Sequence, residues 1–262
     1  MKNLNIDKSK VALRFAQAGQ SYTEHAIVQK QITQHLFDLI GKYCPEIFGK
    51  HLENVLEIGC GSGNLTHLLI KKLQIKYLIL NDLYPEIQQH FLNYQNLDYL
   101  IGDIEQHKLP QDLTLVASSS ALQWIIDLDG LLKKIHYSLN SQGFLCFSTF
   151  GQQNLKQIKS LTGQGLEYLS LENIQEKLQQ HGFEILHISE QTQVLSFEHP
   201  KQILQHLKAT GVTATASNFR WTKHSLQDFY LNYQQFLFPN EHGQQVYTLS
   251  YHPIYCIARR MS

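Results

Sequence analysis

The chain has 262 residues, 43% of them hydrophobic, and its 22 basic and 22 acidic residues balance. This length allows one large α/β domain with a sizeable core. The balanced charge argues against a general nucleic-acid binder, which would carry a basic excess. Residues 1–10 lack the apolar run of a secretory signal, and no stretch reaches the roughly 20 apolar residues needed to cross a bilayer. We therefore expect a cytoplasmic protein without a membrane partner.

The spacing of cysteines and histidines gives no signal for a metal or a disulfide framework. The four cysteines are far apart and include no C-x-x-C pair, so we expect buried thiols. The 14 histidines form no H-E-x-x-H motif, and we expect no metal centre.

The predicted elements begin with a helical arm over residues 1–50. One helix is expected around Ser9–Ala18 and a second from the segment Ser21–Glu24, which matches a capping box. Helices ahead of the first strand can cross the mouth of a ligand pocket, so Tyr22 and Gln29 are candidate ligand contacts. The alternative is that Tyr22 only starts a helix and Gln29 is solvated.

An apolar strand then runs into a glycine-rich turn at Asn54–Gly63, which reads N-V-L-E-I-G-C-G-S-G. The strand suits a parallel sheet buried on both faces, and leucines at helical spacing follow it. At such a turn, residues without a Cβ let the backbone approach a ligand, and the helix N-terminus offers free N–H groups. The spacing is not the dinucleotide fingerprint G-x-G-x-x-G, which disfavours a nicotinamide cofactor. The candidate cofactor-binding residues here are Glu57, Gly59, Cys60, Gly61 and Gly63.

Acidic residues follow the next two predicted strands, Tyr77–Leu80 and Leu97–Ile101. Asp82 lies about 20 residues past the loop, where a nucleotide-binding α/β unit places the carboxylate that accepts from ribose hydroxyls. Taken alone, either Asp82 or Asp103 is equally well a helix cap, since Asp is a preferred cap residue. Their order after the glycine turn favours ligand contacts, made together with the apolar residues that follow each acid, Leu83 and Ile104.

A fourth predicted strand, Leu113–Ala117, ends at the run Ser118–Trp124. Ligands of open α/β sheets lie beyond the carboxyl ends of the strands, so Ser118, Ser119 and Trp124 are expected to face the ligand. The alternative for Trp124 is an anchor that packs the following helix, because an indole buries a large apolar area.

The second half of the chain is predicted to continue the alternation of strands and helices. The expected order is a helix over Leu128–Leu139, a strand over Phe144–Phe150, a polar loop over Gly151–Ser170, a helix capped by Ser170 and running to Gln180, one or two strands over Phe183–Phe197, a helix from Pro200, a helix from Ser225 and a last strand over Val246–Ala258. We expect one domain over 1–262: a doubly wound, mostly parallel seven-stranded sheet over 51–199 and 244–262, with 200–243 inserted as a helical lid.

The run V-L-E-I-G-C-G-S-G resembles motif I of the class I S-adenosylmethionine-dependent methyltransferases, which have a Rossmann-like fold. Over nearly its whole length the chain also resembles the malonyl-acyl carrier protein O-methyltransferases that begin pimelate synthesis for biotin. The matching blocks are Val11-Ala12, Arg14-Phe15, Ser21–Ala26, Ser118–Trp124, Phe147–Gly151 and His206–Val212. The chain departs from that family at Thr23, where Asp is frequent, and at Tyr84, where Ser is usual before the proline.

This resemblance implies methyl transfer from S-adenosylmethionine to the carboxylate of malonyl-acyl carrier protein, with S-adenosylhomocysteine as the other product and no metal. It also implies that Asp103 bonds the adenine amine while Ile104 flanks the ring. A carboxylate is already ionised at neutral pH, so no general base is expected. Tyr22 and Trp124 would only position the reacting groups.

Acyl carrier proteins are acidic, so a neutral chain must gather its positive charge locally to attract one. The arm and the insertion are expected to supply that charge, and Lys208 or Arg220 is the candidate for the malonyl carboxylate. The alternative is that these are solvated charges. Two other functions stay open: methylation of another small acid or metabolite, and a non-catalytic cofactor-binding scaffold. The basic residues concerned are Lys8, Lys10, Arg14, Lys201, Lys208, Arg220 and Lys223.

Overall fold

The computed structural model describes residues 7–9, 11–13, 26–211 and 221–261. Its centre is a seven-stranded sheet in the order β3-β2-β1-β4-β5-β10-β6. Neighbouring strands are parallel from β3 to β5, and β10 is antiparallel to both β5 and β6. The doubly wound, mostly parallel sheet is therefore confirmed. Its strands are β1 (His51–Ile58), β2 (Gln74–Asp82), β3 (Leu97–Ile101), β4 (Leu113–Ser119), β5 (Leu139–Phe150), β6 (Phe183–Glu190) and β10 (Pro253–Arg260).

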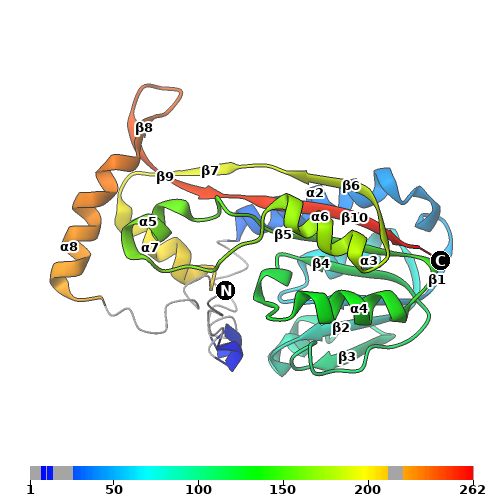
Figure 1. The fold of residues 1–262 in the computed structure, drawn as a ribbon. Coiled ribbons are helices and arrows are strands. Elements are labelled where there is room, and N and C mark those ends of the chain that lie inside the picture. The colour runs from blue at the N-terminus through cyan, green and yellow to red at the C-terminus, as the bar shows by residue number, and fades with distance from the viewer. Residues whose placement is uncertain (1–6, 10, 14–25, 212–220, 262) are drawn as a thin grey trace.

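Helices cover both faces of this sheet. Residues of β1 alternate between them: Val55 packs into the cluster with α2 and α3, and Leu56 packs into the cluster with α4 and α6. Figure 1 shows α4 and α6 in front of the sheet and α2 behind it. Burial on both faces explains the continuous apolar runs of the central strands. The helices are α2 (Ile27–Tyr43), α3 (Asn64–Lys72), α4 (Leu128–Ser138) and α6 (Leu171–Gln180), with short 3₁₀ turns η1 (Pro45–Ile47), η2 (Pro85–Phe91) and η3 (Leu122–Trp124).

A second, three-stranded antiparallel sheet lies at one end of the first, on the left of Figure 1. Its strands, in the order β7-β9-β8, are β7 (Gln193–Phe197), β9 (Gln245–Tyr251) and β8 (Leu237–Pro239). Phe229, Tyr233 and Leu249 of this region belong to the same buried cluster as α2. The described parts of the segment 200–243 therefore pack onto the main core. The helical elements of this segment are α7 (Pro200–Ala209), α8 (Lys223–Asn232) and η5 (Tyr233–Phe236). The neighbouring helix α5 (Lys156–Thr162) comes from the loop after β5.

The single last strand expected over Val246–Ala258 is wrong, because β9 and β10 are separate strands in different sheets. The break falls at His252, which is buried. Its backbone carbonyl accepts from the Gly151 N–H (2.8 Å), and its Nδ1 accepts from the Gln153 N–H (3.1 Å). The loop after β5 thus takes the hydrogen bonds that a continuous strand would give to a neighbouring strand.

The polar loop expected over Gly151–Ser170 contains a helix, α5. Its Gln157 side chain is buried and bonds the side-chain hydroxyl (2.8 Å) and the backbone N–H (3.1 Å) of Ser250 in β9. Sequence periodicity missed α5 because it is short and is held by a polar contact with β9.

The helix boundaries follow the predicted signals only in part. Ser170 caps α6 by accepting from the Asn173 N–H, and Pro200 begins α7, as expected. The capping segment Ser21–Glu24 lies outside the described residues, and α2 begins at Ile27 after a non-helical Ala26. Residues 8–9 and 11–13 are helical and overlap the start of the first predicted helix. No helix in the described ranges is long and apolar enough to span a membrane.

Candidate functional site

A pocket opens at the carboxyl ends of β1, β2 and β4, between the glycine turn, α2 and the described N-terminal residues. Most of the described cofactor-binding candidates from the sequence line this cavity. Those that line it are Gln29, Glu57, Gly59, Cys60, Gly61, Asp82, Leu83, Asp103, Ile104, Ser119 and Trp124.

Each glycine of the turn has a positive φ, and two of them are also confined by close neighbours. A Cβ on Gly59 would lie 2.3 Å from the Cβ of Ala121, and one on Gly63 would lie 2.7 Å from the Phe91 ring. A Cβ on Gly61 would meet nothing within 4 Å, so that residue borders open pocket. Gly63 is thus required for packing at the start of α3, whereas Gly61 presents its backbone to a ligand.

Asp82, at the end of β2, is hydrogen-bonded to the backbone of this turn. Its Oδ2 accepts from the Gly61 N–H (2.8 Å), and its Oδ1 accepts from the Leu83 N–H (2.7 Å). Burial raises the pKa of Asp82 to about 6, although these backbone hydrogen bonds favour the ionised form. Each carboxylate oxygen can accept a further bond, so Asp82 can brace the loop and still accept from a ligand hydroxyl.

Glu57, at the end of β1, is a second buried acid in the pocket. Its pKa is raised to about 8, chiefly by burial; a 2.7 Å hydrogen bond from the Thr66 hydroxyl opposes the rise, and the Asp82 carboxylate contributes to it. Two neighbouring buried carboxyl groups disfavour being charged together. This part of the pocket therefore suits a ligand that brings positive charge.

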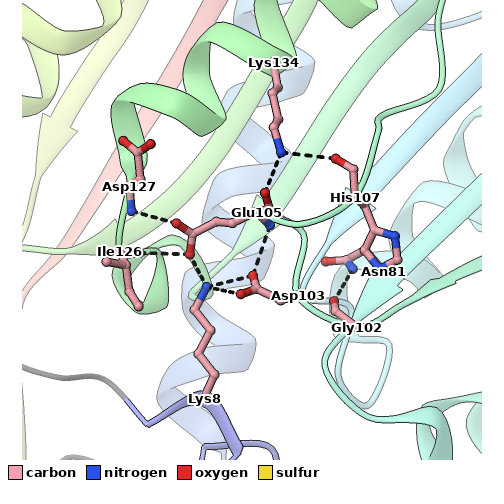
Figure 2. A network of polar contacts seen from close by, with 9 residues as sticks. All are labelled: Lys8, Asn81, Gly102, Asp103, Glu105, His107, Ile126, Asp127 and Lys134. Carbon is pink, nitrogen blue, oxygen red and sulfur yellow. Dashed lines mark hydrogen bonds and ion pairs between the residues drawn. The ribbon is translucent and has the colours of Figure 1, made fainter.

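Asp103 is paired with Lys8 of the N-terminal segment (Figure 2). Both of its carboxylate oxygens lie 2.7 Å from Lys8 Nζ, and the same ammonium pairs with Glu105. The Lys8 side chain is only 15% exposed. The assignment of Lys8 to an exposed carrier-docking surface is therefore wrong, because its charge is already used at the pocket.

A row of hydroxyl groups forms another wall. Thr33 Oγ1 lies 2.8 Å from Ser119 Oγ, which lies 3.3 Å from Ser148 Oγ. The sequence reading missed Thr33, although it follows Gln29 by four residues and so shares its helix face. In contrast, Ser118 does not line the pocket; its hydroxyl is buried and donates to the Ile58 carbonyl (2.8 Å).

Two buried polar atoms in this wall have no hydrogen-bond partner within the described part of the chain, Gln29 Oε1 and Ser120 Oγ. Gln29 is 5% exposed, so the expectation that it might be solvated is wrong. Ser120 has a φ of 57°, an uncommon conformation for a residue other than glycine. A buried polar atom without a partner is costly, and a bound ligand would satisfy these two.

Trp124 is not the anchor of the following helix, because its buried cluster contains no residue of α4. It lines the pocket and also packs in a small cluster with Val11 and Leu166.

Lys201 and Lys208 lie exposed on α7, and no described residue of 200–243 lines the pocket. The candidates Arg14, Tyr22 and Arg220, like Lys10, lie outside the described residues. Within the described ranges, no group of three or more His, Cys, Asp and Glu side chains is placed to hold a metal ion.

Comparisons with known proteins match this geometry. Residues 28–188 match the family described as methyltransferase domain. Two solved structures share the fold: a methyltransferase from Bacillus halodurans (16% identity, 85% of this chain and 99% of that chain, TM-score 0.62), and phosphoethanolamine N-methyltransferase 2 of Haemonchus contortus in complex with S-adenosyl-L-methionine (16% identity, 87% of this chain and 53% of that chain, TM-score 0.52).

Curated relatives are much more similar in sequence. A malonyl-[acyl-carrier protein] O-methyltransferase of Acinetobacter baylyi is 51% identical over 99% of both chains. A protein of the same name from Bacteroides thetaiotaomicron is 38% identical over 97% of this chain and 99% of its own. With the pocket at the glycine turn and likeness over almost the full length, the chain belongs to the methyltransferase domain family and, within it, to the malonyl-[acyl-carrier protein] O-methyltransferases.

Proposed function

We propose that the protein transfers a methyl group from S-adenosylmethionine to the free carboxylate of a malonyl group carried by acyl carrier protein. The observation that carries this proposal is the 51% identity to a relative of that name over 99% of both chains. The products would be S-adenosylhomocysteine and the malonyl methyl ester, the compound that would start pimelate synthesis for biotin. A cytoplasmic location stays a prediction.

The pocket fits S-adenosylmethionine on three observations. The buried acids Glu57 and Asp82 favour a positively charged ligand, the unpartnered Gln29 Oε1 offers an acceptor, and Gly61 leaves the turn open toward the cavity. Asp82 would accept from the ribose hydroxyls. Asp103 would accept from the adenine amine, with Ile104 beside the ring. Tyr22, outside the described residues, stays a predicted contact.

Bound S-adenosylmethionine would supply an electrophilic methyl group on a sulfonium. The protein then has little acid–base work to do, because a malonyl carboxylate with an ordinary pKa near 4 is ionised at neutral pH. Its residues must align the carboxylate oxygen with the methyl carbon and remove water from around it. Trp124, in the pocket wall, would shape the site without exchanging a proton.

A neutral donor is well placed to orient the substrate carboxylate. Among the described lining residues, Lys8 is the only lysine or arginine, and Asp103 and Glu105 already neutralise it. In the same wall, the Thr33 hydroxyl already donates to the Gln29 carbonyl (2.8 Å), and Ser119 Oγ bonds Thr33 and Ser148. Ser120 Oγ has no partner among the described residues, so its hydroxyl is the one available to a ligand. A hydroxyl donor orients a carboxylate without the tight ion pair that would reduce its nucleophilicity.

We also propose that acyl carrier protein is the partner and that exposed basic residues attract it. Lys201 and Lys208 lie on the solvent side of α7 and do not line the pocket. This placement favours a role for Lys208 in docking over the alternative of holding the malonyl carboxylate. Arg14 and Arg220, outside the described residues, stay predicted members of this surface.

Mass spectrometry of malonyl-acyl carrier protein incubated with the protein and S-adenosylmethionine tests the function. We expect the carrier-bound malonyl group to gain one methyl, and to gain none when the cofactor is omitted. A methylated free acid with an unchanged carrier would support the small-acid alternative. Cofactor binding without methylation of either substrate would support the non-catalytic scaffold.

A further inference from the structure

Lys8 joins the beginning of the chain to the loop after β3, which lies 95 to 97 residues further along. Its ammonium sits between the Asp103 and Glu105 carboxylates, as Figure 2 shows. The side chains of Lys8, Asp103 and Glu105 are 15%, 24% and 10% exposed. An ion pair this far from solvent is screened less than a surface pair, so it can hold one segment against another.

The segment that Lys8 holds forms one wall of the cofactor pocket. Lys8 and Val11 both line the cavity, and Val11 is 2% exposed because it packs with Trp124 and Leu166. The N-terminal residues are thus attached at two points: an ionic one at the β3 loop and an apolar one at the Trp124 cluster. Both attachments hold this wall of the pocket against the rest of the domain.

The acidic half of the ionic contact is organised without Lys8. Glu105 accepts from the Ile126 N–H (3.0 Å) and the Asp127 N–H (2.7 Å), and Lys134 donates to the Glu105 carbonyl (2.5 Å). Asp103 Oδ1 also accepts from the Glu105 N–H (3.0 Å). These bonds fix the carboxylates in place, as Figure 2 shows. Breaking the ion pair therefore removes one of the two attachments of the N-terminal segment and leaves the Asp103 and Glu105 carboxylates in place.

We propose that Lys8 is the latch that keeps this segment closed over the bound cofactor and so sets how fast S-adenosylmethionine and S-adenosylhomocysteine leave. The inference rests on the proposed cofactor. Asp103 is also the acid assigned to the adenine amine, and each of its oxygens can accept more than one bond. The ligand and Lys8 can thus meet at one carboxylate, where the ligand excludes water and strengthens the ion pair.

The test measures the rate at which S-adenosylhomocysteine dissociates, by stopped-flow fluorescence. The chain has two tryptophans, so a Trp221→Phe background leaves Trp124, in the pocket wall, as the sole indole. In that background we expect Lys8→Met to release the ligand about tenfold faster, the effect of losing a charge-assisted hydrogen bond. Lys8→Arg, which keeps the charge, should restore most of the slow release.

Lys76→Met is the matched control, because Lys76 forms an exposed ion pair with Glu53 and does not line the pocket. It should leave the release rate unchanged. If Lys8 only stabilised the fold, the release rate would depend on salt equally in the parent protein and in Lys8→Met. The latch predicts that rising salt speeds release from the parent protein more than from Lys8→Met, because only the parent exposes the Lys8 ammonium to salt when the segment opens.

A double-mutant cycle with Glu105→Gln completes the test. If the two residues act as one latch, Lys8→Met should accelerate release far less in the Glu105→Gln protein than in the parent. Additive effects, or a release rate that Lys8→Met leaves unchanged or slows, overturn the latch while the cofactor assignment stands. Failure of the parent protein to bind either ligand overturns the proposed cofactor and the latch with it.

Discussion

The buried carboxyl group of Glu57 makes the stability of the ligand-free protein depend on pH. Glu57 is 1% exposed, and burial raises its pKa from 4.5 to about 8. A carboxyl group whose pKa is raised by folding holds its proton more tightly in the folded chain than in the unfolded one. The free energy of unfolding should therefore fall as the pH rises from 4.5 to about 8, and level off above that.

Glu57→Gln removes this titration while keeping the side-chain shape. Each pH unit between the two pKa values contributes about 1.4 kcal/mol, so the full effect is on the order of 4 to 5 kcal/mol. The amide oxygen of Gln can still accept from the Thr66 hydroxyl, which now bonds Glu57 Oε2. We expect the variant to gain stability over the parent progressively from pH 5 to pH 8.

Urea unfolding of the ligand-free protein at several pH values measures this difference. Glu53→Gln is the matched control: Glu53 lies in the same strand, is 62% exposed at its side chain and pairs with the exposed Lys76. An exposed pair of this kind contributes little to stability because water and salt screen it, so that variant should track the parent. If Glu57→Gln differs from the parent by the same amount at pH 5 and pH 8, Glu57 is not held protonated by burial and the reasoning fails.

Three further predictions concern the ligands. Asp82→Ala should weaken cofactor binding by about tenfold to a hundredfold through loss of bonds to a charged acceptor; calorimetry showing unchanged affinity in the folded variant would refute the ribose assignment. Because burial raises the pKa of Asp82 to about 6, the affinity of the parent protein for the cofactor should fall as the pH drops from about 7 to 5. With saturating cofactor, the single-turnover rate should be flat from about pH 6 to 8, because the substrate carboxylate is ionised throughout; a tenfold rise per pH unit would point to a hydroxyl or amine substrate. Reversal of Lys201 and Arg220 to Glu should raise KM for the carrier-bound substrate more than for a short malonyl thioester, with a smaller difference at high salt; equal losses on both substrates would place these residues in the pocket or the fold.

Local sequence was enough to predict the elements that depend on backbone conformation and apolar periodicity. The glycine turn is an example, because Gly59, Gly61 and Gly63 all adopt positive φ values that other residues avoid. The buried halves of the strands around it follow from apolar runs, although β1 and β2 begin earlier than those runs, at His51 and Gln74. Asp82 and Asp103 could be placed in one pocket because the carboxyl ends of parallel strands meet at the same edge of the sheet.

Contacts between distant segments decided the rest. The break between β9 and β10 depends on a loop about 100 residues earlier that bonds His252, and α5 is held by Gln157 on Ser250. Apolar periodicity continues through such a break, so nothing local marks it. The same limit applies to Ser118, which lies among candidate ligand contacts in the sequence but donates to the carbonyl of Ile58 in β1.

The pairing of Lys8 shows the difference most clearly. In the sequence it is one of several basic residues near the N-terminus, and its charge could equally face solvent or a partner. Only the fold brings it within 2.7 Å of Asp103. The net charge of a chain follows from its composition, but the ion pairs that each charged side chain forms depend on which opposite charges the tertiary structure places beside it. The sequence alone thus determined the sheet, the turn and the acids at its edge, while the tertiary structure decided which basic residue those acids hold.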